Sequence, residues 1–395
     1  MCNAILALLA SERYQRLTIA RSEVVLITTL FVFSCTHDIS ALKSTVFNSA
    51  LQFELLVESP NEEEEEEALS QLRSSLSARL WDISARPEFA LPHTLTTDLL
   101  SMLRCWLSAP QPQMQLCACS IFRNLTISHQ ATSDLIRQTH INDLLIDIIR
   151  NSSDVQVLEE ALRLYRNLAV HPDYKIMLAD NEAMDAITIL WSKHPVQIVQ
   201  YAAARVIRQL LTGESFNVKL FLTLKPKQAE DLKPGNTYIA RLMNLYANTV
   251  DLGTKMEVAQ IVVAMWRAGT PRTETQGAAP INIDDAIRQA ETVGANIAKP
   301  VMAMITESEN PSLVTQGWLG LALMAGTKEG SVAVANILCD ADNQVVLQKT
   351  LLEDHGESLA KDGNNASILL RLLKKNHVRA ETKYALDGML TLYSI

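Results

Sequence analysis

Three stretches of this sequence resemble one another: ACSIFRNLTISH at residues 118–129, ALRLYRNLAVH at residues 161–171 and AARVIRQLLT at residues 203–212. The Arg-Asn-Leu or Arg-Gln-Leu tripeptide inside each stretch begins at Arg123 and recurs at Arg166 and Arg208. The spacing is therefore nearly constant. Such a period predicts a chain assembled from copies of one unit, each of which buries its apolar face against its neighbours.

Apolar residues keep their place in each copy, at Ala118, Phe122 and Leu125, then Ala161, Tyr165 and Leu168, then Ala203, Ile207 and Leu210. This 3–4-residue spacing is one face of a helix, and Ser153 or Asp154 is a plausible N-cap for the second copy. No glycine precedes Gly213, which disfavours tight hairpins and phosphate-binding loops. A helical repeat of about 40–47 residues is of the armadillo or HEAT type. The fold class is therefore predicted to be all-α, an armadillo-type right-handed α-solenoid.

The chain divides by composition into six segments. We predict a divergent N-terminal segment with an acidic run at 1–67, armadillo repeats at 68–223, a linker at 224–236, a helical repeat unit at 237–268, a second linker at 269–280 and C-terminal helical repeats at 281–395. Residues 54–67 end in six consecutive glutamates, which predicts a solvated loop or a frayed helix start. Within the repeats, a helix is expected near 133–150, and helical pattern continues at 281–309, 311–326, 331–352 and 358–395.

Composition restricts the kinds of ligand. The net charge is −9, and the sequence has no cluster of Lys and Arg of the kind that binds nucleic acid by releasing counterions. We expect no nucleic-acid partner; an acidic solenoid suits a basic protein segment. The six cysteines form no C-x-x-C pair, so reduced, mostly buried thiols in a cytoplasmic protein are expected, with no metal and no cofactor.

Residues 24–35 (VVLITTLFVFSC) form an uncharged run. A bilayer-spanning helix needs about 20 apolar residues, so we expect a buried helix or an atypical chain end here, and no stable membrane insertion.

The column Asn124, Asn167 and Gln209 is the most specific candidate site. Asparagine is disfavoured inside helices, yet here an amide recurs beside the core positions. Two interpretations are open. The amides hydrogen-bond the backbone of a partner along the inner surface of the solenoid, or each amide caps a carbonyl of its own or a neighbouring helix.

The arginines before these amides, Arg123, Arg166 and Arg208, also allow two interpretations. They pack over the helix with the charge in water, or they contact an acidic surface of a partner. No H-E-x-x-H or G-x-S-x-G motif and no spaced Cys/His set occurs. We therefore expect no catalytic residues and a binding protein, not an enzyme, although a site assembled across repeats stays an alternative.

The segments IFRNLTISHQATSDLI (residues 121–136) and ALRLYRNLAVHPDYKIMLADNEAMDAI (residues 161–187) resemble armadillo repeats of the Smg guanine-nucleotide dissociation stimulator (SmgGDS) family. KPVMAMITESENPSLVTQGWLGLALMAG (residues 299–326) resembles a later repeat of that family, whereas the first 90 residues do not match well. The resemblance implies a cytoplasmic protein that binds small GTPases of Rho or Ras type with a polybasic tail and promotes GDP release, as exchange factor or chaperone. It also implies that Asn124 and Asn167 contact the GTPase. Gln209 departs from the family's asparagine. Glu159, Glu160, Asp180 and Glu182 are candidates by position for the basic tail.

A general armadillo adaptor that binds an extended peptide of a partner is the alternative. Import receptors that bind peptides have similar repeats with a W-x-x-x-N pattern. This chain lacks that pattern. The rate of fluorescent-GDP release from a panel of GTPases distinguishes an exchange factor from an adaptor.

Overall fold

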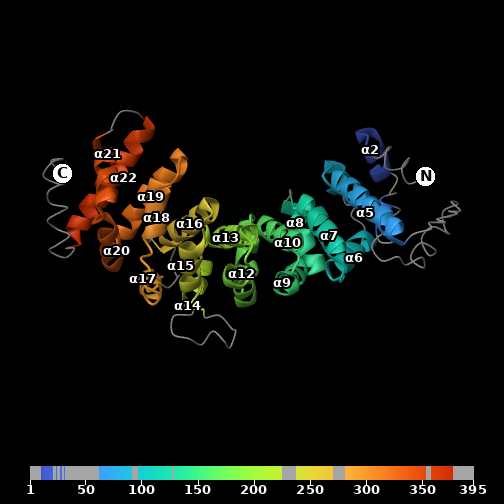
Figure 1. Ribbon diagram of the computed structural model, residues 1–395, viewed down its shortest axis with the longest axis horizontal. Helices are drawn as coiled ribbons and strands as arrows, with labels where there is room; N and C mark the ends of the chain where they lie inside the picture. Colours follow the sequence, from blue (N-terminus) through green and yellow to red (C-terminus); the bar gives the residue numbers. More distant parts are fainter. Residues whose placement is uncertain are drawn as a thin grey trace. The chain divides into compact units, whose positions relative to one another are not determined.

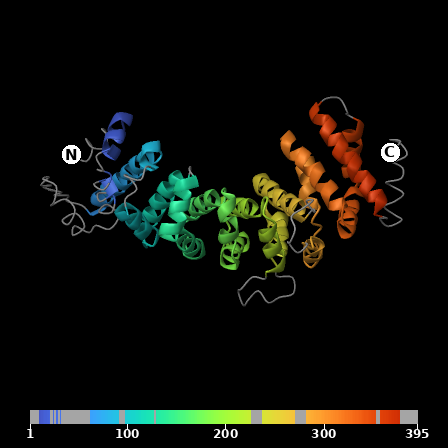
Figure 2. The ribbon, with the colours of Figure 1, turned by 180° about the vertical axis from the view of Figure 1, so that it is seen from behind.

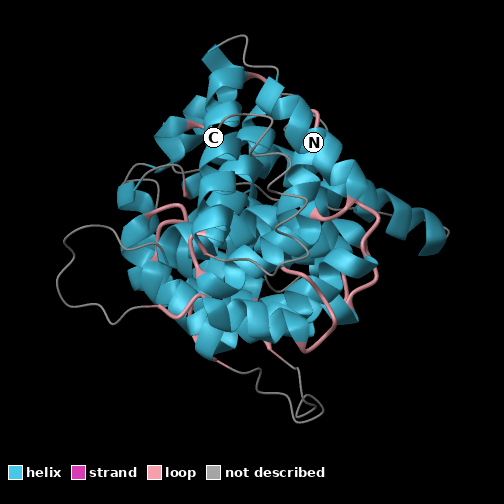
Figure 3. Ribbon diagram, turned by 90° about the vertical axis from the view of Figure 1, so that its left-hand side faces the viewer, coloured by secondary structure: helices cyan, strands magenta, loops and turns pink. Residues whose placement is uncertain are grey.

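The computed structural model describes residues 10–20, 24, 27–28, 31, 62–90, 97–126, 129–224, 237–269, 281–352 and 357–376. Every regular element within these ranges is a helix, as Figure 3 shows. The prediction of an all-α fold is confirmed for the described part of the chain.

The chain forms two compact units, unit 1 at Met1–His171 and unit 2 at Pro172–Ile395. Unit 1 contains α2 (Glu12–Ala20), α5 (Glu62–Ser84), the 3-10 helix η1 (Pro87–Ala90), α6 (Thr97–Leu107), α7 (Pro112–Leu125), α8 (His129–Thr139), α9 (Ile141–Asn151) and α10 (Val155–Leu168). The helices α5, α7 and α10 form one layer, in which α7 packs against both neighbours (Figure 1). The short helices α6 and α9 cover α7 and α10.

Local sequence explains where the long helices of unit 1 begin. Pro112 is the first residue of α7, a position where its missing N–H costs nothing. Asp154 is the N-cap of α10, and its carboxylate accepts hydrogen bonds from the backbone N–H groups of Gln156 and Val157 at 2.9 and 3.0 Å. Of the two N-caps predicted, Asp154 is therefore the one used.

The apolar columns of the repeat form the core. Phe122 and Tyr165, the large members of their columns, are fully buried. The remaining seven positions of the three copies are equally inaccessible, at most 1% exposed: Ala118, Leu125, Ala161, Leu168, Ala203, Ile207 and Leu210. Stacked long helices thus exclude water from the face that the repeat period marks.

Unit 2 has two layers of helices. Its elements are α11 (Pro172–Leu178), α12 (Asn181–Lys193), α13 (Gln197–Leu211), α14 (Ser215–Thr223), α15 (Tyr238–Asn248), α16 (Leu252–Gly269), α17 (Asp284–Glu291), α18 (Lys299–Thr306), α19 (Pro311–Ala325), α20 (Lys328–Leu338), α21 (Ala341–Leu352) and α22 (Glu357–Lys375). One layer follows α13, α16, α19 and α22, and the other follows α12, α15, α17 and α20 (Figure 2).

Two glycines allow α19 to approach its neighbours in unit 2. A Cβ atom at Gly320 would lie 2.7 Å from Val263 of α16 and 2.9 Å from Val301 of α18. At Gly317 it would lie 2.7 Å from Ile305. These glycines therefore serve close helix packing, because any side chain would separate the helices.

The predicted helix at 133–150 and two stretches of predicted helical pattern are each two helices in the structure. Residues 133–150 divide between α8 and α9 at His140, whose φ of 50° is left-handed and ends α8. Residues 281–309 divide between α17 and α18 after Gly294, whose φ is 68°, and residues 331–352 divide between α20 and α21. Apolar periodicity continues through such breaks, so it cannot locate them.

The N-terminal predictions are partly covered by the described residues. The six glutamates at 62–67 belong to α5, so they form a helix start and not a loop. Val24, Ile27, Thr28 and Phe31 of the uncharged run are helical and buried. Residues 54–61 and nearly all of both predicted linkers lie outside the described residues. Among the helices that are described, none has the length and hydropathy needed to cross a bilayer.

Candidate functional site

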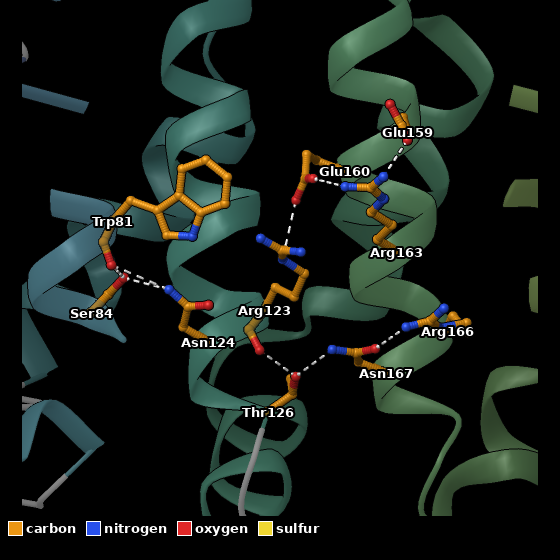
Figure 4. A network of polar contacts seen from close by, with 10 residues as sticks. All are labelled: Trp81, Ser84, Arg123, Asn124, Thr126, Glu159, Glu160, Arg163, Arg166 and Asn167. Atoms are coloured by element: carbon orange, nitrogen blue, oxygen red, sulfur yellow. Dashed lines mark hydrogen bonds and ion pairs between the residues drawn. The ribbon is translucent and has the colours of Figure 1, made fainter. Parts of the chain in front are cut away.

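The amide of Asn124 is held by the preceding long helix. Its Nδ2 donates a hydrogen bond to Ser84 Oγ at 2.9 Å and lies 3.4 Å from the carbonyl oxygen of Trp81, both at the C-terminal end of α5 (Figure 4). Ser84 in turn donates to the same Trp81 carbonyl at 2.9 Å. Asn124 is half-buried, and its Oδ1 accepts no hydrogen bond from the described residues.

Asn167 repeats this arrangement on α10, the next long helix. Its Nδ2 donates to Thr126 Oγ1 at 3.4 Å, and Thr126 donates to the carbonyl oxygen of Arg123 at 2.6 Å. The Oδ1 of Asn167 accepts a hydrogen bond from Arg166 at 3.1 Å. In both copies, a hydroxyl caps the end of one long helix and receives the amide of the next.

Arg123 reaches forward along the same layer, from α7 to α10. Its Nε lies 3.2 Å from Oε2 of Glu160, an ion pair without hydrogen-bond geometry. Its guanidinium carbon lies 5.4 Å from the ring centroid of Trp81, whose residue surface is 46% exposed. Arg123 thus connects an exposed aromatic ring of α5 with a buried carboxylate of α10.

Both candidate glutamates of α10 are already paired. Arg163 donates to Glu160 at 2.9 Å and to Glu159 at 2.5 Å. The side chain of Glu160 is 9% exposed and that of Glu159 is 17% exposed. Arg166 is half-buried on the same helix and donates to Asn167. Figure 4 shows that contacts join Arg123, Glu160, Glu159, Asn167 and Arg166 over α7 and α10, and that the contacts of Asn124 beside them lead to Trp81 and Ser84 of α5.

The third copy, on α13 in unit 2, has a related arrangement. Nε of Arg208 donates to Oε2 of Glu257 on α16 at 2.5 Å, and Nε of Arg205 lies 3.7 Å from Oε1 of the same carboxylate. Glu257 is 6% exposed. Gln209 is half-buried on the same helix. A buried glutamate that faces two arginines is therefore common to both units.

Among the described residues, two observations concern chemical roles: the state of the Cys119 thiol and the arrangement of the possible metal ligands. Burial, followed by the charges of Glu160 and Cys117, raises the pKa of the Cys119 thiol far above its ordinary value. That thiol is therefore neutral and unreactive at physiological pH. The described ranges also hold no group of three or more His, Cys, Asp or Glu side chains placed to bind a metal ion.

Reasoning from the sequence missed several residues of this region. Ser84 binds Asn124, Thr126 binds Asn167, and Glu257 binds Arg208. Two further residues lie beside the predicted arginines: Trp81 next to Arg123, and Arg205 next to the Glu257 that Arg208 binds. One signal was present: a hydroxyl follows the repeated column, as Thr126 in one copy and Thr212 in another, and each caps the end of its helix. Glu257 had no such signal, because a linker of different length precedes it.

Known structures share this fold. An engineered protein superposes with a TM-score of 0.56 at 18% identity, over 77% of this chain and 65% of its own. A designed armadillo repeat protein in complex with the peptide (KR)4 gives 0.52 at 14% identity, over 69% of this chain and 99% of its own. A chain from a study of the interaction between cadherin and β-catenin gives 0.52 at 16% identity, over 86% of this chain and 60% of its own.

The fold therefore defines an armadillo-repeat protein, as the repeat period predicted. The chain spans about two thirds of the length of the engineered protein and less of the cadherin–β-catenin study chain. No family model matches the sequence, and no curated protein does. The likeness to the SmgGDS family consequently rests on the sequence segments alone.

Proposed function

We propose that the chain is a non-catalytic binding protein whose long helices hold an extended segment of a partner protein. The observation that carries this proposal is the Oδ1 atom of Asn124, which has no hydrogen-bond donor among the described residues. Its Nδ2 is fixed to α5, so the acceptor is oriented before any partner arrives. A preoriented polar group binds with a smaller loss of conformational entropy.

An extended backbone suits this surface. It presents N–H and C=O groups that a side-chain amide can pair without selecting the partner's side chains. Asn167, one helix further, has a second N–H beyond the one given to Thr126. The exposed ring of Trp81 lies beside Arg123 and offers an apolar face next to the amides. The armadillo protein solved with the peptide (KR)4 supports peptide binding as a property of this fold class.

The roles proposed for the charged residues follow from their pairs. Arg123 and Arg166 contribute to the surface of α7 and α10 in unit 1, and Gln209 contributes the corresponding amide of α13 in unit 2. A basic segment reaches Glu159 or Glu160 only by displacing Arg163. Binding through these two glutamates would therefore exchange an internal ion pair for one with the partner.

Peptide display tests the proposal directly. A random dodecapeptide library is selected against the immobilised chain and then against Asn124→Ala/Asn167→Ala. The control is Asn151→Ala, because Asn151 is an exposed amide at the end of α9 in the same unit. We expect peptides that bind the chain and the control and bind the double variant at least tenfold more weakly. Peptides that bind all three equally would contradict the proposal.

A second, finer function rests on the sequence resemblance: the partner is a small GTPase of Rho or Ras type, and binding promotes GDP release. No catalytic side chain is needed, because an exchange factor accelerates release by binding the nucleotide-free GTPase more tightly than the loaded one. The test follows fluorescent-GDP release from Rho, Rac and Ras-type GTPases with and without the chain. Acceleration by the chain, but not by the double variant, supports it. No acceleration and no complex across the panel argues for an adaptor.

A further inference from the structure

Arg205 on α13 is an arginine without a hydrogen-bonded partner in the described part of the chain. Its Nε is buried and donates no hydrogen bond, and its nearest carboxylate oxygen, Glu257 Oε1, lies 3.7 Å away. The side chain as a whole is 35% exposed. Its guanidinium carbon lies 5.4 Å from the ring centroid of Tyr201, one turn earlier on the same helix. The ring limits the positions of the guanidinium while leaving its N–H groups unused.

The carboxylate beside Arg205 is already neutralised. Arg208 donates to Oε2 of Glu257 at 2.5 Å, so one negative charge faces two positive ones. The glutamate is also the least accessible member, since its side chain is 8% exposed against 25% for Arg208 and 35% for Arg205. The exposed part of this cluster therefore carries an excess positive charge.

Three other arginines differ from Arg205, whereas Arg123 in unit 1 resembles it in facing a glutamate without hydrogen-bond geometry. Arg163 on α10 donates to two glutamates, and Arg241 on α15 donates to Asp185 and Thr188. Arg288 on α17 pairs with Asp285 and Glu329. These donors make hydrogen bonds or short ion pairs within the fold, whereas Arg205 donates no hydrogen bond to any of the described residues and has only the 3.7 Å ion pair with Glu257.

We propose that Arg205 binds the carboxylate of an acidic side chain in the partner's extended segment. The inference rests on the proposed function and names a further contact, made by the copy of the repeat that belongs to unit 2. A guanidinium presents a planar fork of N–H donors that matches a carboxylate in two parallel hydrogen bonds. Gln209 comes four residues after Arg205 on α13 and therefore lies on the same helix face. Its amide is placed to contact the partner's backbone next to the bound acidic residue.

The occupant is a single acidic residue of a protein rather than a nucleic acid. One excess guanidinium matches one carboxylate, whereas binding to a polyphosphate chain draws on many cations in a row. The chain as a whole carries −9, which repels a polyanion more than a segment with one acidic residue.

The test uses the dodecapeptide selection with the full chain, Arg205→Glu and Lys328→Glu. Lys328 is exposed and is the first residue of α20. Lys328→Glu therefore makes the same change in net charge as Arg205→Glu, at a helix start where an acidic side chain is stabilising. We expect peptides selected on the chain and on Lys328→Glu to carry Asp or Glu at one fixed position. Arg205→Glu should select Lys or Arg there and bind the original peptides about tenfold more weakly. Thermal unfolding of each variant shows that it is folded.

The outcomes separate this inference from the proposed function. Peptides without an acidic position, or with one that Arg205→Glu leaves unchanged, would overturn the role of Arg205 while the binding function stands. If no peptide is selected on the chain, both fail. Binding of labelled poly(U) that Arg205→Glu abolishes, with no peptide selected, would overturn the acidic-segment proposal in favour of a nucleic acid. A phosphoserine in place of the selected acidic residue shows whether the site prefers phosphate, and tighter binding of that peptide would contradict the carboxylate preference.

Discussion

Nε of Arg123, near the end of α7, lies 3.2 Å from Oε2 of Glu160 in the second turn of α10. Unit 2 contains the same relationship, because Arg208 near the end of α13 pairs with Glu257 in the second turn of α16. In both cases the glutamate is buried and the arginine comes from the preceding long helix. We interpret these pairs as contacts that fix the register of neighbouring long helices, on which the spacing of the surface amides depends.

Removing the buried Glu160 should cost more stability than removing the half-buried Glu159. Glu160→Ala breaks two ion pairs, with Arg123 and Arg163, and we expect it to lower the free energy of unfolding by about 1–2 kcal/mol, since both arginines can regain water. Glu159→Ala should cost about 0.5 kcal/mol at most, as for other single surface pairs. Urea unfolding measures both, and equal losses would contradict this role.

The contact between Asn124 and Ser84 should be energetically coupled. At 2.9 Å it is a good hydrogen bond to a buried hydroxyl, so a double-mutant cycle of Asn124→Ala and Ser84→Ala should give about 1 kcal/mol of coupling. The equivalent cycle of Asn167→Ala and Thr126→Val should give less, because that bond is 3.4 Å long. Additive effects in the first cycle would show that the amide does not connect the repeats.

The two arginines of α13 should differ in their contribution to stability. Arg208→Gln leaves the buried carboxylate of Glu257 with Arg205 at 3.7 Å, and we expect a loss of about 2 kcal/mol. Arg205→Gln should change stability by about 0.5 kcal/mol or less, because no hydrogen bond within the described residues is lost. Chemical unfolding of the two variants checks this order, and the reverse order would refute the assignment of Arg205 to a partner.

Unfolding at alkaline pH should depend on Tyr246. Burial, and then the nearby Glu307 carboxylate, raises the pKa of this phenol from 10.0 to about 12. Above pH 10 the unfolded chain releases the phenolic proton while the folded chain keeps it. Stability should therefore fall as the pH rises from 10 to 12, by about 1 kcal/mol per pH unit from this group.

Tyr246→Phe removes that contribution. The variant should show a shallower decline of the unfolding free energy when urea unfolding is compared at pH 9, 10 and 11. An identical pH dependence would mean that Tyr246 titrates alike in both states.

The long helices could be predicted from the sequence with little error. Their apolar residues at Phe122, Tyr165 and Ile207 recur with the repeat, and each proved to be core. The boundaries of the short helices could not be predicted in the same way. The helix breaks at His140, whose backbone is left-handed. No glycine or proline, the residues that usually indicate a break, occurs there.

The candidate surface could be located but its contacts could not. The amide column identified the helix faces on which these contacts lie. Periodicity along one helix, however, does not indicate which side chains of the neighbouring helix contact that face. Glu160 looked from its position like a candidate for a basic partner, and the structure pairs it with two arginines. The acceptor Ser84 lies on α5, where Leu80 stands in place of an amide at the position that corresponds to Asn124.

The most direct test of the central claim is the affinity of a display-selected peptide for this surface, measured by isothermal titration calorimetry. The claim predicts that Asn124→Ala/Asn167→Ala raises the dissociation constant at least tenfold, which is about 1.4 kcal/mol, while Asn151→Ala leaves it unchanged. The same dissociation constant for the chain and for a folded double variant would contradict the claim that these amides bind the partner.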